Sequence, residues 1–91
     1  MNEKTEALYR LILQLKTPED CRDLFGDLCT EKEIEKMAER VLAARLLMQG
    51  KTYQQVIAET EISSATLSRV SRCVQYGNGY SRFLKTDTED S

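Results

Sequence analysis

The side chains best suited to binding an anion or a base edge lie near the C-terminal end of the chain. Arg69 and Arg72 are three residues apart, so both would project from one side of a helix. Between Ile62 and Lys85 the sequence has four basic residues and no acidic one, a local charge of +4, although the whole chain carries −2. A guanidinium group can donate two parallel hydrogen bonds to a phosphate or to guanine O6 and N7. Because a solvated surface can also be basic, the geometry of this stretch has to decide between the two interpretations.

A helix over residues 63–76 would place these arginines opposite an apolar face. At 100° per residue, one side gathers Ser63, Leu67, Val70, Ser71 and Val74. The opposite side is small, hydroxylic and basic, as a DNA recognition helix requires, because small residues permit close approach to bases and hydroxyls bind phosphates. An ordinary amphipathic surface helix is the alternative. We predict DNA contacts from six residues of this helix: Ser64, Ala65, Thr66, Ser68, Arg69 and Arg72.

A second short helix is predicted immediately before this one. Thr52 and Gln55 have the spacing of a capping box, and the helix should end near Thr60 with Val56 and Ile57 pointing inward. After a brief turn, Ser63 or Ser64 caps the next helix. Two short helices joined by such a turn form a helix-turn-helix unit. The N-terminus of the first helix would hold a phosphate through Lys51, Thr52 and Gln54.

Two positions depart from the usual helix-turn-helix pattern. The turn position that commonly holds a left-handed glycine is Glu61, which we expect to cost about 1 kcal/mol. Ile57 stands where alanine is common, which predicts a wider separation of the two short helices.

The first half of the chain predicts three further helices, and no strand-like alternation persists anywhere. Residues 3–16 have a broad apolar stripe, wider than a peripheral helix of a 91-residue monomer needs; it consists of Leu8, Tyr9, Leu11, Ile12, Leu13 and Leu15. Thr17 and Pro18 begin the next helix, which would bury Cys21, Leu24, Phe25 and Leu28. We therefore predict an all-α fold.

The third of these helices is the longest. Thr30 and Glu33 form a predicted capping box at its start, and Gly50 suits the residue just beyond its end, near Gln49. Its inner side is predicted to consist of Ile34, Met37, Ala38, Val41, Leu42 and Met48.

Composition excludes several classes of protein. On folding, a chain of this length buries only about 60–65% of the surface that it exposes when unfolded, so a single core gives marginal stability. Three cysteines cannot all pair and none forms a Cys-x-x-Cys motif, which favours free thiols in the cytoplasm. No apolar run reaches membrane-spanning length, and no signal-peptide pattern is present, so no membrane partner is expected. Histidine is absent, which removes the commonest metal ligand and general base; we expect no metal, no cofactor and no enzyme.

Several strings of residues resemble the tryptophan-repressor superfamily over residues 28–72: Leu28-Cys29-Thr30-Glu31, Glu39-Arg40-Val41, Leu46-Leu47-Met48-Gln49-Gly50 and Ser64-Ala65-Thr66-Leu67-Ser68-Arg69. The chain is still more similar to the small Trp-repressor-like proteins of the YerC/YecD group. This similarity extends to about Leu84 through Gly50-Lys51-Thr52-Tyr53, Ser68-Arg69-Val70-Ser71-Arg72-Cys73 and Tyr76-Gly77-Asn78-Gly79-Tyr80.

The resemblance implies a Trp-repressor-like helical bundle that forms an intertwined homodimer. The broad apolar face of the first helix would then be buried in the partner. Two recognition helices about one DNA turn (~34 Å) apart imply a palindromic operator in double-stranded DNA. In this interpretation 1–85 is a single domain, with dimerisation helices over 1–50, the helix-turn-helix over 51–76 and a C-terminal turn over 77–85. Residues 86–91 are predicted to be a disordered acidic tail.

The resemblance also raises the question of an effector. In the repressor two arginines sandwich the indole ring of tryptophan, and the matching positions here are Arg40 and Arg69. The glycine that follows the second arginine in the repressor is replaced by Val70, which the predicted core needs, so tryptophan is not the expected ligand. Another small-molecule corepressor is left open. The plainer alternative for Arg40 is pairing with Glu35 or Glu39 on an exposed helix face.

The leading hypothesis is thus a homodimeric DNA-binding transcriptional regulator, with two alternatives left open. The first is a protein-interaction module that presents the same face to an acidic partner, which the pI of 5.2 favours.

The second alternative concerns the role of Gly77-Asn78-Gly79, a predicted tight turn framed by two tyrosines. Tyr76, Tyr80 or Arg82 could contact a phosphate there, or the tyrosines could fold back over the helix-turn-helix.

Overall fold

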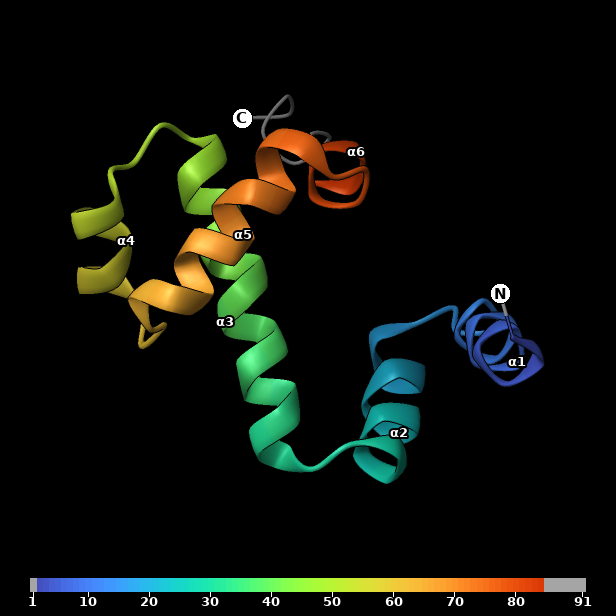
Figure 1. The fold of residues 1–91 in the computed structure, drawn as a ribbon. Helices are drawn as coiled ribbons and strands as arrows, with labels where there is room; N and C mark the ends of the chain where they lie inside the picture. Colours follow the sequence, from blue (N-terminus) through green and yellow to red (C-terminus); the bar gives the residue numbers. More distant parts are fainter. Residues whose placement is uncertain (1, 85–91) are drawn as a thin grey trace. The chain divides into compact units, whose positions relative to one another are not determined.

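The computed structural model describes residues 2–84, which form six α-helices and no strand (Figure 1). The all-α fold class is therefore confirmed for this part of the chain. Lys85 and the predicted tail over 86–91 lie outside the described residues. The helices are α1 (Glu3–Ile12), α2 (Pro18–Leu28), α3 (Glu31–Met48), α4 (Tyr53–Glu59), α5 (Ser64–Tyr76) and α6 (Tyr80–Phe83). The chain divides into two compact units, one up to Ile34 and one from Glu35 onward.

In the first unit, α1 is shorter than predicted. It begins where the Asn2 side chain accepts a hydrogen bond from the Thr5 N–H at 2.8 Å, and it ends at Ile12 rather than at Lys16. The reason lies in the start of α2. The Lys16 N–H donates to the Asp20 carboxylate at 3.0 Å, while the Asp20 N–H donates to the Thr17 hydroxyl at 3.0 Å. These two bonds hold residues 16 and 17 in the cap of α2 instead of in α1.

Neither α1 nor α2 contains a buried residue. Leu24 and Phe25 are half-buried, but the predicted burial of Cys21 and Leu28 is wrong for the single chain, because Cys21 is exposed and Leu28 is 47% exposed. The apolar stripe of α1 is likewise open to solvent at Leu8, Tyr9 and Leu11. These two helices therefore carry apolar surface that their own chain leaves uncovered.

Both predicted ends of α3 are confirmed to within a residue. At its start, the Glu33 N–H donates to the Thr30 hydroxyl at 3.1 Å, and the Thr30 N–H donates to the Glu33 carboxylate at 2.8 Å. The hydrogen bonds from the Thr30 backbone and hydroxyl lower the pKa of the Glu33 carboxyl below its ordinary value. At its end, Gly50 has a φ of +91°, and the Lys51 N–H donates to the Leu46 carbonyl at 3.0 Å.

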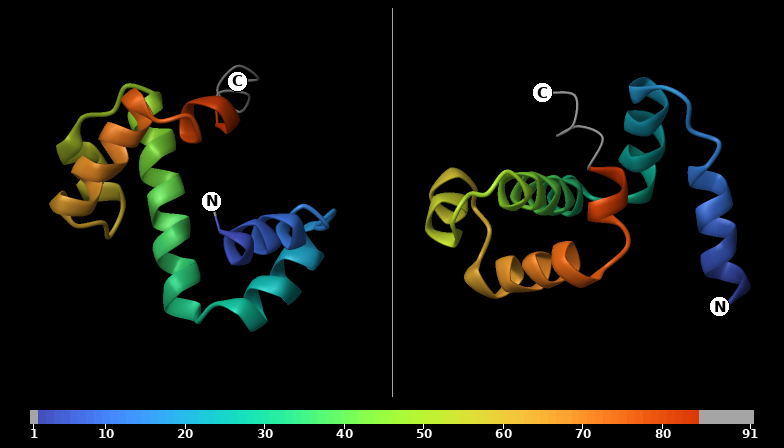
Figure 2. Two further views of the ribbon diagram at one scale, coloured as in Figure 1. Left: turned by 45° about the vertical axis from the view of Figure 1, so that its right-hand side comes forward. Right: turned by 90° about the horizontal axis from the view of Figure 1, so that it is seen from above.

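The second unit has a buried core. In Figures 1 and 2, α4 and α5 lie beside the C-terminal half of α3. The predicted inner side of α3 is wrong at four exposed residues: Met37, Ala38, Val41 and Leu42. The helix is apolar on more than one side, and the side that packs here is the one with alanines, whose methyl groups allow close approach of neighbouring helices. The core consists of Ala43, Ala44, Leu46, Val56, Ile62, Leu67, Val70 and Leu84.

The segment predicted as a C-terminal turn contains a one-turn helix, α6, that the sequence did not indicate. Leu84, just after it, joins the core, and Tyr80 packs against that core. Gly77 permits the turn between α5 and α6, because a Cβ at this position would lie 2.6 Å from the Cys73 carbonyl oxygen. The same carbonyl accepts the Gly77 N–H at 2.8 Å.

Candidate nucleic-acid interface

The first short helix, α4, has the capping box that the sequence predicts. The Gln55 N–H donates to the Thr52 hydroxyl at 3.2 Å, and the Thr52 N–H donates to the Gln55 side-chain oxygen at 2.9 Å. Val56 is fully buried, as predicted. Ile57 is not, since 41% of the residue is exposed, while the wider separation of α4 and α5 stays a prediction.

The turn between α4 and α5 contains no left-handed residue. No residue other than glycine has a positive φ within residues 2–84, so the predicted strain at Glu61 is wrong. Instead, side-chain oxygens accept hydrogen bonds from two backbone N–H groups of the turn. The Glu61 N–H donates to the Glu39 carboxylate at 3.2 Å, and the Ile62 N–H donates to the Thr60 hydroxyl at 3.3 Å. Ile62 itself is buried in the core, which fixes the turn from the inside.

The second short helix, α5, begins with a hydroxyl cap. Ser63 rather than Ser64 is the N-cap, because its Oγ accepts the Thr66 N–H at 3.2 Å. The predicted inner face is confirmed at Leu67, which is fully buried, and at Val70, which is 2% exposed. Ser63 is exposed and belongs to the cap, not to that face.

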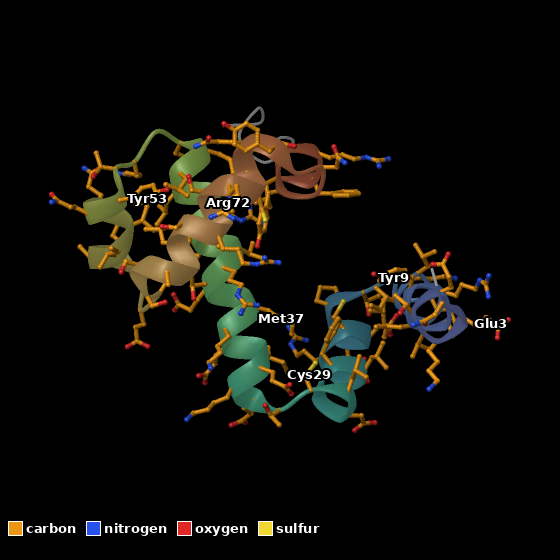
Figure 3. All side chains as sticks on the ribbon, in the orientation of Figure 1. Glu3, Tyr9, Cys29, Met37, Tyr53 and Arg72 are labelled. Carbon is orange, nitrogen blue, oxygen red and sulfur yellow. The ribbon has the colours of Figure 1, made fainter. Side chains whose placement is uncertain are left out.

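The opposite face of α5 is open to solvent. Ser64, Ala65, Ser68, Arg69 and Arg72 are all exposed, and Thr66 is half-buried at the cap. Within residues 2–84 neither arginine side chain forms a hydrogen bond or an ion pair. Both guanidinium groups therefore keep their full set of donors for a phosphate or a base edge. Figure 3 shows Arg72 on α5.

The side chains predicted at the start of α4 are also accessible. Lys51, Thr52 and Gln54 are exposed, but the Thr52 hydroxyl already accepts the Gln55 N–H. Sequence reasoning missed Tyr53, an exposed aromatic residue between them that is labelled in Figure 3. Its phenol can donate to a phosphate oxygen, as tyrosines do in protein–DNA interfaces.

Arg40 is exposed, and its predicted pairing with Glu35 or Glu39 does not occur in the described chain. The Glu39 carboxylate accepts the Glu61 N–H instead. Val70 is buried, so the position that holds glycine in the repressor is filled here by a core side chain. The hypothesis that Arg40 and Arg69 bind an effector stays a prediction.

The two tyrosines around Gly77-Asn78-Gly79 differ in their environment. Tyr80 folds back against the core, whereas Tyr76 is 80% exposed. The Arg82 guanidinium lies 5.1 Å from the centroid of the Phe83 ring, a cation–π distance. An open cavity of about 470 Å³ lies beside this segment, lined by Val41, Cys73, Gly77, Asn78, Gly79, Tyr80, Phe83 and Leu84.

Residues 2–84 bring no three His, Cys, Asp or Glu side chains together as a metal site. In the same part of the chain, no helix has the length and apolarity needed to cross a bilayer. All three cysteines are free thiols.

Comparison with known proteins agrees with this geometry. The family profile of the Trp repressor protein matches residues 3–88. The uncharacterized protein YerC of Bacillus subtilis (strain 168) is 43% identical over 94 residues, covering 98% of this chain and 90% of YerC.

Two solved structures are similar over nearly the whole fold. A candidate Trp repressor from Staphylococcus aureus is 36% identical, with a TM-score of 0.90 and coverage of 97% of this chain and 89% of its own. A TrpR-like protein from Eubacterium eligens ATCC 27750 is 37% identical, with a TM-score of 0.88 and coverage of 93% and 89%. The resemblance found in the sequence is confirmed: the chain belongs to the Trp repressor family.

Proposed function

We propose that this protein is a sequence-specific DNA-binding transcriptional regulator that acts as a homodimer in the cytoplasm and is not an enzyme. Membership of the Trp repressor family supports this function. The observation that carries it is the outward face of α5. Its small residues and two unpaired arginines are exposed, while Leu67 and Val70 anchor the other side of the helix in the core.

Each predicted contact has a distinct role in this proposal. Arg69 and Arg72 donate hydrogen bonds to base edges or phosphates in the major groove. Lys51, Thr52 and Gln54 hold a backbone phosphate at the start of α4. Four small or hydroxylic residues of α5 lie close to the groove floor or the backbone: Ser64, Ala65, Thr66 and Ser68.

The uncovered surface of the N-terminal helices supports the homodimer. Leu8, Tyr9 and Leu11 are 36%, 50% and 40% exposed in the single chain, so covering the exposed part of each is worth about 0.5–1.5 kcal/mol. A second copy offers a surface of matching chemistry. In helix-turn-helix dimers the two half-sites lie about one DNA turn (~34 Å) apart, so a two-fold dimer of this protein would bind a palindromic operator.

A second candidate function is binding of an acidic protein partner through the same face of α5. The net charge of −2 and the pI of 5.2 favour it, because a DNA-binding protein that relies on electrostatic attraction is usually basic. The salt dependence of DNA binding separates the two functions, since phosphate contacts release counterions and make the logarithm of affinity fall linearly with the logarithm of salt concentration.

The test measures the affinity of purified protein for genomic fragments over a series of salt concentrations. Arg69→Ala and Arg72→Ala should each weaken binding by roughly 5- to 150-fold, from about 1–3 kcal/mol per base contact, or lower the salt slope by about 1 if the contact is to phosphate. Arg22→Ala is the matched control, because it removes the same charge from an exposed position on α2. Circular dichroism verifies that every variant is folded. If the double variant Arg69→Ala/Arg72→Ala binds as tightly as Arg22→Ala, the proposed interface is wrong.

A further inference from the structure

We propose that Glu39 is a positioning residue for the recognition helix, because its carboxylate ties the turn between α4 and α5 to α3. The structural part of this inference stands on the geometry of the turn. Its consequence for affinity rests on the proposed DNA-binding function.

The contact between Glu39 and the turn is a tertiary hydrogen bond. The Glu39 Oε2 atom accepts the Glu61 N–H at 3.2 Å, and the two residues are 22 positions apart in the sequence. The capping bonds of α1 to α5 described above connect residues at most four positions apart, so they hold only their own helix ends. The Glu39 bond instead fixes one helix to the loop that leads into another.

The turn has no left-handed residue, and the Glu39 carboxylate is the acceptor that its Glu61 N–H has within residues 2–84. Thr60 accepts the Ile62 N–H, and the Thr66 N–H is capped by Ser63, but neither of these neighbours reaches the Glu61 amide. Glu39 is half-buried, whereas Glu61 is exposed. A carboxylate on a helix that packs into the core therefore holds an exposed amide only two residues before the cap of α5. Charge-assisted hydrogen bonds of this kind are stronger than neutral ones.

Because Glu39 is negatively charged, the direction in which its removal changes DNA affinity tests the proposal. A carboxylate near a DNA-binding face repels phosphates, so its removal should strengthen DNA binding if electrostatics alone matters. If Glu39 positions the recognition helix, its removal should weaken binding instead. Glu35 is the matched control, because it is an exposed carboxylate one turn earlier on the same helix that forms no hydrogen bond or ion pair within residues 2–84.

The experiment compares Glu39→Ala, Glu39→Gln and Glu35→Ala in the full-length protein. In Glu39→Ala, hydrogen exchange at the Glu61 amide, followed by NMR, should be about 5- to 10-fold faster than in the wild type. Affinity for a DNA fragment selected by the wild type should fall by a similar factor. Glu39→Gln keeps a side-chain oxygen acceptor, so both its exchange rate at the Glu61 amide and its DNA affinity should be close to those of the wild type. Glu35→Ala should leave the exchange rate unchanged and the DNA affinity equal or higher.

Three results would overturn the proposal or its premise. Unchanged exchange at the Glu61 amide in Glu39→Ala shows that the hydrogen bond does not hold the turn. Faster exchange with unchanged or stronger DNA binding shows that the bond does not position the helix. Wild-type protein that binds no DNA overturns the proposed function, and the exchange ratio still decides whether Glu39 fastens the turn.

Discussion

The two units of this chain differ in whether they bury their apolar side chains. Up to Ile34, two amphipathic helices contain no buried residue, and leucines such as Leu11 are open to solvent. From Glu35 onward, residues of α3, α4 and α5, the turn at Ile62 and Leu84 after α6 form a core that includes the fully buried Val56 and Leu67. An apolar stripe therefore shows only that a helix needs to be covered. Whether its own chain or another one covers it is a separate question.

The difference assigns separate tasks to the two units in the proposed function. A unit with its own core can hold the recognition helix in a fixed orientation, since Leu67 and Val70 anchor one face while Arg69 and Arg72 stay free on the other. A unit without buried residues gains stability by covering its stripe with a second copy. Substitutions in the second unit should therefore change folding stability, and substitutions in the first should change association.

Leu67→Ala should destabilise the protein most, because it removes a fully buried side chain from the core of the second unit. Deleting such a leucine costs about 2–5 kcal/mol, through the lost burial and the cavity that remains. Urea denaturation measures the loss. The core lies within one chain, so the change in unfolding free energy relative to the wild type should not depend on protein concentration. A loss below about 1 kcal/mol would contradict the assigned core.

Leu11→Ser should act through association instead. In the single chain Leu11 is 40% exposed, so a monomer would tolerate the change, whereas a dimer that buries the rest of this leucine should lose about 0.6–1.2 kcal/mol of association energy per chain. Sedimentation over a range of concentrations measures the dissociation constant. Arg10→Ser is the matched control, since it places the same residue at a neighbouring exposed position of α1. Equal dissociation constants for the two variants would remove the stripe from the interface.

The smallest effect concerns the capping box at the start of α3. Hydrogen bonds from Thr30 lower the pKa of the Glu33 carboxyl below its unfolded value of about 4.3. A lowered folded-state pKa means that the ionised carboxyl contributes stability above the unfolded pKa and loses it as the pH falls through the folded value. NMR titration should show the pKa of Glu33 rising part of the way toward its ordinary value in Thr30→Ala, because the variant loses the hydroxyl but keeps the backbone N–H of residue 30. An identical titration in both proteins would show that the Thr30 hydroxyl does not act on this carboxyl in solution.

Local features of the fold could be predicted from the sequence alone. The caps at Thr17, Thr30 and Thr52 and the left-handed Gly50 are each encoded by a few adjacent residues, and the structure contains all four. The division of α5 into an apolar and a basic face was also predictable, because helical periodicity fixes it. The recognition-helix side of the candidate site therefore needed no tertiary information.

The features that sequence reasoning missed depend on distant contacts. Periodicity could not tell which side of α3 packs, because that helix is apolar on more than one side, and the core uses Ala43 and Ala44 rather than Val41. The Glu39 contact joins residues 22 positions apart, so no local sequence pattern predicts it. For the same reason, the sequence could not show that the Glu61 backbone is unstrained. Helix α6 has only four residues, and its position depends on Leu84 reaching the core.

DNA recognition by α5 can be tested by selecting genomic fragments with the purified protein at about 150 mM salt and sequencing them. We expect enrichment of a short palindrome whose half-sites are about one DNA turn apart, and loss of that enrichment with Arg69→Ala but not with Arg22→Ala. A folded dimer that enriches no sequence, or an enrichment that Arg69→Ala leaves intact, would contradict the claim that α5 reads DNA.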